Sequence, residues 1–333
     1  MCWPSTDAPR NPIAAIDPAT YRRHPIHGEE RIWGETNCYT DLVVELLHGL
    51  GFEPAAMLAF TLAIDFEGDQ WTFFKPPHHD LDALYGADVQ ELAIWRPLAD
   101  HVAEQVDAGR PVLVELDSWF LPDTAGTAYR RAHQKTTVAV NAIDVGRRRL
   151  GYFHNAGYFA LEGDDFRDVF QLDGLAHERM LPPYVEYVKW RPGFTPPRGQ
   201  ALVDASVDLL RRHLARVPAS NPFPRFKARF EQDLEWLMKA PIERFHTYSF
   251  ATLRQYGACF ELAETYLRWL AASGVDGLAA PAGALRDVAQ TAKAFQFQLA
   301  RAMARRKPLE LGAIDAMGAQ WSRAMDGLRR RFP

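Results

Sequence analysis

Hydrophobic positions follow a helical period in the first and last parts of the chain. After a polar stretch, leucine and valine recur at helical spacing over residues 42–50, and Gly49 and Gly51 supply a stop signal. This pattern predicts a helix that begins near residue 38. Helical spacing returns over 89–106, interrupted by a proline. From residue 200 it continues almost throughout, with prolines dividing it into roughly four to six helices.

Between these helical regions, short apolar runs are typical of strands. The runs over 111–117, 136–144, 150–155 and 184–190 are rich in valine, threonine and aromatic residues. Only a glycine-containing turn separates the second run from the third, which predicts an antiparallel hairpin. The order of helix, sheet and helices predicts an α+β fold followed by an all-α region.

A segment rich in proline and glycine, residues 191–199, separates the strand-rich part from the helical part. We therefore expect two domains, an α+β domain over 1–195 and a helical domain over 196–333. Residues 1–35 show no period, and we expect them to form an arm packed over the body of the protein.

Composition narrows the class of protein. Hydrophobic residues make up 47% of the chain and charged residues 24%, with a net charge of −4, so nothing indicates a basic surface for nucleic acid. Three cysteines form no paired framework, which favours a reducing, cytoplasmic location. There is no secretory signal pattern and no run of roughly 18 apolar residues, so we expect neither export nor a membrane partner.

Cys38 stands where a polar turn becomes the first predicted helix. The N–H groups and the positive end of the helix dipole favour a thiolate at such a position, and the same N–H groups can stabilise an oxyanion. The alternative is a small buried hydrophobic residue, which is the commoner role of a single cysteine.

A cysteine nucleophile needs a base and a group that orients the base. Among the 11 histidines, His133 alone stands at the entrance to a predicted strand. Asn155 ends the next strand and could hold the imidazole in one tautomer, whereas His154 should face the opposite side of the sheet. Taken singly, His133 is better explained as a surface histidine and Asn155 as a turn residue; only the joint arrangement favours a catalytic site.

Other polar groups have two possible roles each. Asp117 could line the cleft or bind a substrate amine, or it could be an acid in a turn. Asn37 and Gln70 are candidate oxyanion donors. The acids and histidines over 78–82 could ligate a metal, but Asp80 also fits a helix cap, and we expect no metal. Phosphate-loop and dinucleotide motifs are absent, so no bound cofactor is expected.

The order of cysteine, histidine and amide resembles that of papain-like enzymes. The stretches 37–41, 109–122 and 133–144, together with 253–264 in the helical part, resemble the family of butirosin biosynthesis protein H. Residues 65–75 and 152–158 look more like the domain-of-unknown-function family 1839. The sequence departs from the transferases where two residues separate His133 from its strand and where Asn155 stands in place of aspartate.

The resemblance implies a papain-like acyltransferase. Such an enzyme takes an acyl or aminoacyl group from a carrier-protein thioester, holds it on Cys38, and passes it to a small amine acceptor. The donor would then be a phosphopantetheine thioester and the partner an acyl carrier protein. Two alternatives remain open, a cysteine peptidase or amidase and an inactive papain-like binding module. Candidate contacts for an acidic carrier are the basic residues Arg211, Arg212, Arg225, Lys227 and Arg229.

Overall fold

The computed structural model describes residues 16–34, 36–175 and 181–333. Their contacts group them into two units whose segments alternate along the sequence. The sheet unit contains the described residues up to His24, Asp41–Glu53 and Gly86–Phe194, and the helical unit contains Pro25–Thr40, Pro54–Tyr85 and Thr195–Pro333. Residues 25–40 and 54–85 therefore belong with the C-terminal helices.

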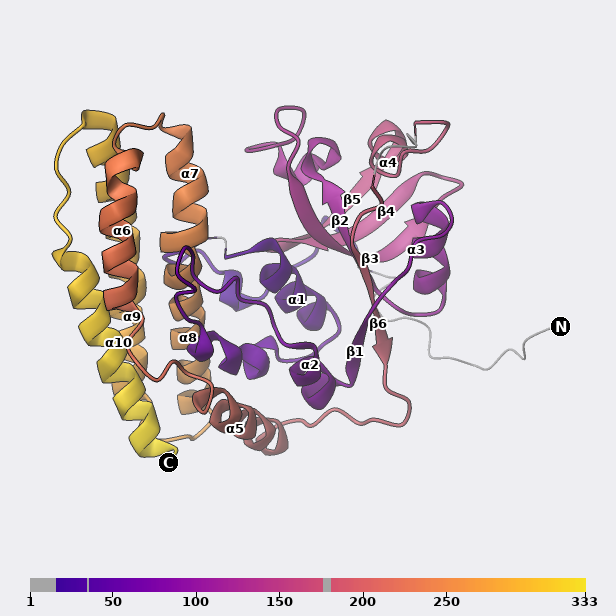
Figure 1. The fold of residues 1–333 in the computed structure, drawn as a ribbon. Coiled ribbons are helices and arrows are strands. Elements are labelled where there is room, and N and C mark those ends of the chain that lie inside the picture. Colours follow the sequence, from indigo (N-terminus) through magenta and orange to yellow (C-terminus); the bar gives the residue numbers. More distant parts are fainter. Residues whose placement is uncertain (1–15, 35, 176–180) are drawn as a thin grey trace. The chain divides into compact units, whose positions relative to one another are not determined.

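The sheet unit is built on a six-stranded antiparallel sheet (Figure 1). Its spatial order is β1-β6-β2-β3-β4-β5, so β6 returns from the end of the unit to lie between β1 and β2. This confirms an α+β fold and the β3–β4 hairpin. The strands are β1 (Ala87–Glu91), β2 (Val112–Asp117), β3 (Lys135–Asp144), β4 (Arg149–His154), β5 (Gly157–Glu162) and β6 (Val185–Trp190).

The helix predicted over 89–106 is wrong in its first part. Residues of β1 pair with β6, and α3 (Leu98–Asp107) begins only after Pro97. Proline fixes its own backbone and restricts the residue before it, so the helical period could not extend back through this position. The strand β5 has no counterpart among the predicted elements.

The two faces of the sheet pack against different elements. Val114, Val138 and Tyr152 point to one face and form a core with α3 and with α4 (Gly163–Val169). On the other face, the end of α1 (Cys38–Gly49) approaches so closely that a Cβ on Gly49 would lie 2.7 Å from the ring of Phe153. The alternation of side chains along each strand produces both cores.

The helical unit contains six α-helices after residue 199, in agreement with the predicted helical region. Before them come η3 (Pro54–Ala63), a 3-10 helix that is almost wholly buried, and α2 (His78–Tyr85). A π-helical turn, η6 (Phe250–Arg254), leads into α8. The six α-helices are α5 (Gln200–Leu214), α6 (Phe223–Leu237), α7 (Glu243–Ser249), α8 (Gln255–Ala272), α9 (Ala279–Arg305) and α10 (Gly312–Arg331).

Aromatic side chains fill the centre of the helical unit. Trp71 follows a tight turn closed by a bridge between Phe66 and Trp71, and it is 1% exposed. Its ring lies 4.8 Å from that of Tyr256 and 5.1 Å from that of Phe223. Aromatic pairs at such separations add to the free energy of burial, so this cluster fixes the turn against α6 and α8. No helix in the described residues is long and apolar enough to cross a membrane.

Candidate active site

Cys38 is the first residue of α1, as the sequence pattern predicts, and it is partly exposed. The N–H groups of a first helical turn have no carbonyl partner within the helix. The N–H of Cys38 belongs to this turn, and the dipole of the 12-residue helix places partial positive charge beside the thiol. The position suits a nucleophile that attacks a carbonyl group, because the N–H groups can stabilise the oxyanion that forms.

Asn37 caps this helix. Its Oδ1 accepts the N–H of Thr40 at 2.9 Å, while its Nδ2 donates to the carbonyl oxygen of Phe74, also at 2.9 Å. The side chain of Thr40 donates to the same carbonyl at 3.2 Å. Both ends of the buried Asn37 amide are thus engaged in holding the helix start. This is a structural role, different from the oxyanion donor that the sequence suggested.

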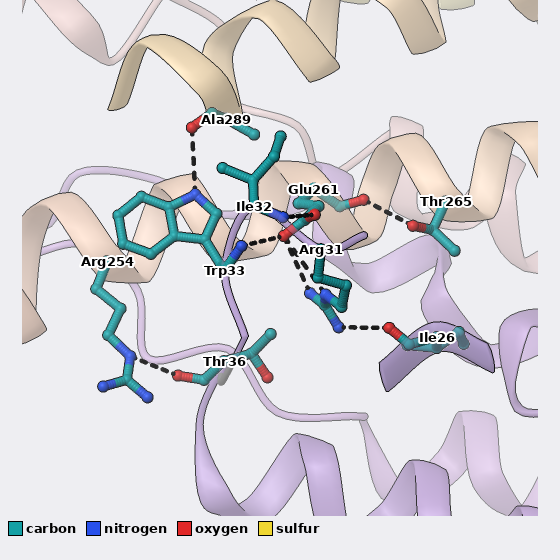
Figure 2. A network of polar contacts seen from close by, with 9 residues as sticks. All are labelled: Ile26, Arg31, Ile32, Trp33, Thr36, Arg254, Glu261, Thr265 and Ala289. Atoms are coloured by element: carbon teal, nitrogen blue, oxygen red, sulfur yellow. Dashed lines mark hydrogen bonds and ion pairs between the residues drawn. The ribbon is translucent and has the colours of Figure 1, made fainter. Parts of the chain in front are cut away.

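The segment that leads to Cys38 is anchored on α8 by Glu261 (Figure 2). One carboxylate oxygen accepts the backbone N–H of Ile32 at 2.7 Å, and the other accepts that of Trp33 at 2.9 Å. The guanidinium of Arg31 lies 3.4 Å from the second oxygen and also donates to the carbonyl of Ile26. A buried carboxylate therefore replaces water for two backbone groups of this segment.

Trp33 completes this anchorage. Its indole N–H donates to the carbonyl of Ala289 at 3.2 Å, and its ring covers Gly257, where a Cβ would lie 2.4 Å from the ring. Nearer the thiol, Arg254 donates to the carbonyl of Thr36 at 3.2 Å (Figure 2). Three residues of the stretch 253–264 thus hold the approach to Cys38, a role that the sequence comparison did not reveal.

In the sheet unit, His133 pairs with Asp117. The imidazole Nδ1 lies 2.6 Å from Asp117 Oδ2, and the side chain of His133 is 66% exposed. Asp117 ends β2 and pairs in register with Lys135, the first residue of β3, so the carboxylate meets the end of the β2–β3 connection. With Nδ1 occupied, Nε2 can accept a proton, and no described residue bonds to it.

Two further contacts fix this pair. The other oxygen of Asp117 accepts the backbone N–H of Trp119 at 3.0 Å, which orients the carboxylate. The indole of Trp119 stacks on the imidazole with 4.4 Å between ring centroids and 6° between planes. A histidine held on one nitrogen by a carboxylate and on one face by an aromatic ring is preorganised for proton transfer.

Asn155 is not placed against His133. It lies in the turn between β4 and β5 with a φ of 46°, a conformation that asparagine tolerates. Because Phe153 pairs with Ala139, continuing the register would set Asn155 opposite Thr137, four residues beyond His133. His133 itself precedes β3 and lies in the β2–β3 connection. Among the described residues, the carboxylate that contacts the His133 imidazole is that of Asp117.

A second histidine–aspartate pair lies buried near the end of β4. His154 Nδ1 is 2.5 Å from Asp123 Oδ2, and Tyr152 donates to the other oxygen at 2.5 Å. On its far side, His154 Nε2 bonds to the hydroxyl of Thr136 at 2.7 Å. The side chains of His154 and Asp123 are 1% and 3% exposed. Asp123 belongs to the connection that carries His133, so this buried pair ties the connection to β4.

A cavity of about 1090 Å³ opens beside the Asp117–His133 pair. Both residues form part of its wall, together with Glu115. The remaining wall comes from the segment before α3, the β2–β3 connection, the end of α4 with the residues after it, and the residues before β6. Its apolar members are Ile94, Pro97, Leu98, Leu116, Phe120, Val169, Phe170, Leu172, Leu175, Leu181, Pro182 and Pro183.

The other predicted groups belong to the helical unit. Gln70 is exposed in the turn before Trp71. Asp80 makes a buried hydrogen bond with His213 at 2.6 Å, and His78 contacts Tyr39, so these side chains serve packing of the helical unit. Within the described ranges, no three or more histidine, cysteine, aspartate or glutamate side chains gather as a metal site requires.

Most of the basic residues considered for carrier binding already contact carboxylates within the helical unit. Such internal ion pairs reduce the net positive charge available to an acidic partner. The pairs are Arg211–Asp208 at 2.8 Å, Arg225–Asp65 at 2.6 Å, Lys227–Asp315 at 2.7 Å and Arg229–Asp233 at 2.9 Å.

Two family models match the chain and cover most of it. The DUF1839 N-terminal domain matches residues 22–190, and the DUF1839 C-terminal domain matches residues 199–330. The first match contains Cys38 and the Asp117–His133 pair, and the second contains Glu261. No curated protein matches the chain.

Proposed function

This chain belongs to the DUF1839 family, and we propose that it is a papain-like cysteine acyltransferase. In this proposal Cys38 carries the acyl group, and His133, oriented by Asp117, moves the protons. The observation that carries the proposal is the 2.6 Å contact between Asp117 and His133, which leaves Nε2 as the proton acceptor. The start of α1 at Cys38 supports the choice of nucleophile.

The first half-reaction is thioester exchange. Nε2 of His133 takes the proton of the Cys38 thiol, and the thiolate attacks the carbonyl carbon of the donor. The carbonyl oxygen becomes an oxyanion, which the first-turn N–H groups of α1 can stabilise. When the tetrahedral intermediate collapses, the donor thiol leaves with the proton from His133. One thioester replaces another, so this step is close to isoenergetic.

The second half-reaction transfers the acyl group to an amine. The amine nitrogen attacks the Cys38 thioester, and His133 accepts the proton that the nitrogen loses. Collapse of this second intermediate forms an amide and releases Cys38, which recovers the proton. Since an amide is more stable than a thioester, the second step drives the sequence. Water in place of the amine would make the enzyme a hydrolase, so exclusion of water determines the outcome.

Intact mass after incubation with acyl N-acetylcysteamine thioesters tests the proposal. We expect one acyl adduct on the unaltered protein and on Cys259→Ser, and none on Cys38→Ala. Addition of a panel of small primary amines should remove the adduct with formation of an amide. An adduct that survives Cys38→Ala, or no adduct from any donor on a folded protein, would refute the nucleophile.

The pairing of this thiol with this imidazole needs a test of its own. The rate of Cys38 alkylation by iodoacetamide follows the thiolate fraction. We expect His133→Gln to slow alkylation at pH 7 by about tenfold or more and to change its pH profile. His79→Gln, at an exposed histidine of the helical unit, is the matched control and should leave the rate unchanged. Equal alkylation rates in the two variants would show that His133 does not deprotonate the Cys38 thiol.

Release of free acid without any amine would indicate the amidase alternative. It would leave Cys38 and His133 in the same roles and change only the acceptor.

A further inference from the structure

We propose that the cavity beside His133 binds an uncharged, medium-length aliphatic acyl group. This inference rests on the proposed function for the identity of the ligand as an acyl group, and on the cavity itself for the apolar character. At about 1090 Å³, the cavity lies just above the usual range of about 300–1,000 Å³ for small-molecule sites. A two-carbon acyl group would leave most of it unfilled.

The charges of the wall argue against an ionic ligand, because each acid already has a basic partner. Asp117 contacts His133, and Glu115 pairs with Lys135 at 2.7 Å. Asp168 pairs with Arg167 at 2.7 Å, and Asp173 pairs with Arg148 at 2.8 Å. A ligand amine or carboxylate would therefore have to displace an existing ion pair or the hydrogen bond between Asp117 and His133, whereas a hydrocarbon chain would not.

The apolar residues of the wall supply the favourable free energy of binding. Leu98 lies at the start of α3, and Val169 and Leu172 lie at the end of α4 and just after it; these side chains also belong to or pack against the core of the sheet unit. A hydrocarbon chain among them loses water-exposed surface, which is worth about 0.8 kcal/mol for each buried methylene. His133 lies on the same wall, so the cavity would hold the chain while its carbonyl remains near the imidazole.

Binding can be measured without chemistry. Calorimetric titration of the Cys38→Ala protein with octanamide and with acetamide compares two uncharged ligands that differ only in chain length. We expect octanamide to bind roughly 100-fold or more tightly than acetamide. Equal affinities would overturn the proposal. This comparison leaves the cavity unaltered, so it does not depend on the folding of any cavity variant.

A filled cavity gives the second test. Leu98→Trp places a larger side chain on the wall and should weaken octanamide binding by about tenfold or more. Leu311→Trp is the size-matched control in the helical unit and should bind octanamide as before. Retained binding in a folded Leu98→Trp protein would show that octanamide sits elsewhere and would overturn the proposal.

The two proposals fail in distinguishable ways. Equally fast acylation of Cys38 by acetyl and octanoyl donors, without octanamide binding, would support the transferase proposal and refute the acyl-binding cavity. If Leu98→Trp abolishes octanamide binding but no donor acylates Cys38, the cavity is an apolar ligand site and the transferase proposal is refuted.

Discussion

The indole ring of Trp119 lies parallel to the imidazole of His133, 4.4 Å away between centroids. This stacking restricts rotation of an imidazole that is otherwise exposed, and so it contributes to the orientation of Nε2. Trp119→Leu keeps an apolar side chain but removes the ring. We expect acyl transfer to fall by about tenfold, because loss of orientation raises the barrier. Steady-state rates measure the effect, and an unchanged melting temperature would confine it to the site.

Loss of the Asp117 carboxylate should lower the rate of acyl transfer more than loss of the Glu115 carboxylate. Asp117→Asn retains an oxygen for the Trp119 N–H but removes the charge that stabilises an imidazolium. We expect acyl transfer to fall on the order of 10²- to 10⁴-fold. Glu115→Gln, two residues earlier on the same strand, removes an acid that pairs with Lys135 instead. Equal losses in both variants would assign the effect to net charge and not to the His133 contact.

The two described cysteines should differ sharply in reactivity. Burial raises the pKa of the Cys259 thiol well above its ordinary value, and its Sγ–H donates to the carbonyl of Thr61 at 3.3 Å. Cys38 is partly exposed. In native protein, iodoacetamide should modify Cys38 and leave Cys259 unmodified until urea unfolds the chain. Peptide mapping by mass spectrometry measures both sites, and modification of Cys259 in the native state would contradict its burial.

The close approach of Trp33 to Gly257 predicts a large effect of one methyl group. Gly257→Ala must displace the indole or the helix, and we expect it to lower the free energy of unfolding by about 1–3 kcal/mol. Gly283 is the matched control, since it lies in α9 with no atom within 4 Å of an added Cβ. Gly283→Ala should be neutral or stabilising by about 0.5–1 kcal/mol. Urea denaturation compares the two variants.

His101 should make stability fall in mild acid. Burial, followed by the nearby charge of Arg96, lowers the pKa of this histidine below its ordinary value of 6.5. Its Nε2 accepts the backbone N–H of Trp95 at 3.2 Å, which requires the unprotonated form. The unfolded chain therefore takes up the proton first as pH falls, so this contribution to stability is present above 6.5 and is lost below it.

Urea midpoints at pH 7.5 and 5.5 measure this dependence. His101→Asn should be less stable than the unaltered protein at pH 7.5 and should lose less stability between the two pH values. His246→Asn, at an exposed histidine of α7, should retain the full pH dependence. If His101→Asn retains it as well, another group is responsible.

Local pattern predicted much of the secondary structure because periodicity reflects which face of an element is buried. The helix at Cys38, the β3–β4 hairpin and the C-terminal helices follow from it. The partner of His133 does not. It depends on strand register and on the path of the connection between Asp117 and His133, and both are set by tertiary contacts such as the buried Asp123–His154 pair.

The local sequence pattern also could not predict how the segment before Cys38 is anchored on α8. Glu261 stands in an otherwise ordinary amphipathic helix, and nothing near it in sequence indicates that it accepts the N–H groups of Ile32 and Trp33. The short motif over 253–264 pointed to the right region without its physical reason. The physical reason is that the Glu261 carboxylate accepts two backbone N–H groups of the segment before Cys38, and that Gly257 leaves room for the ring of Trp33.

The bond between Trp33 and Glu261 joins residues 228 positions apart, which sets an order of events during synthesis. At a ribosomal rate of about 5–20 residues per second, Trp33 is added to the chain roughly 10–50 s before its carboxylate partner. Throughout that interval the segment preceding Cys38 lacks its docking surface on α8. The segment that precedes Cys38 would thus reach its native surroundings only after most of the chain has been made.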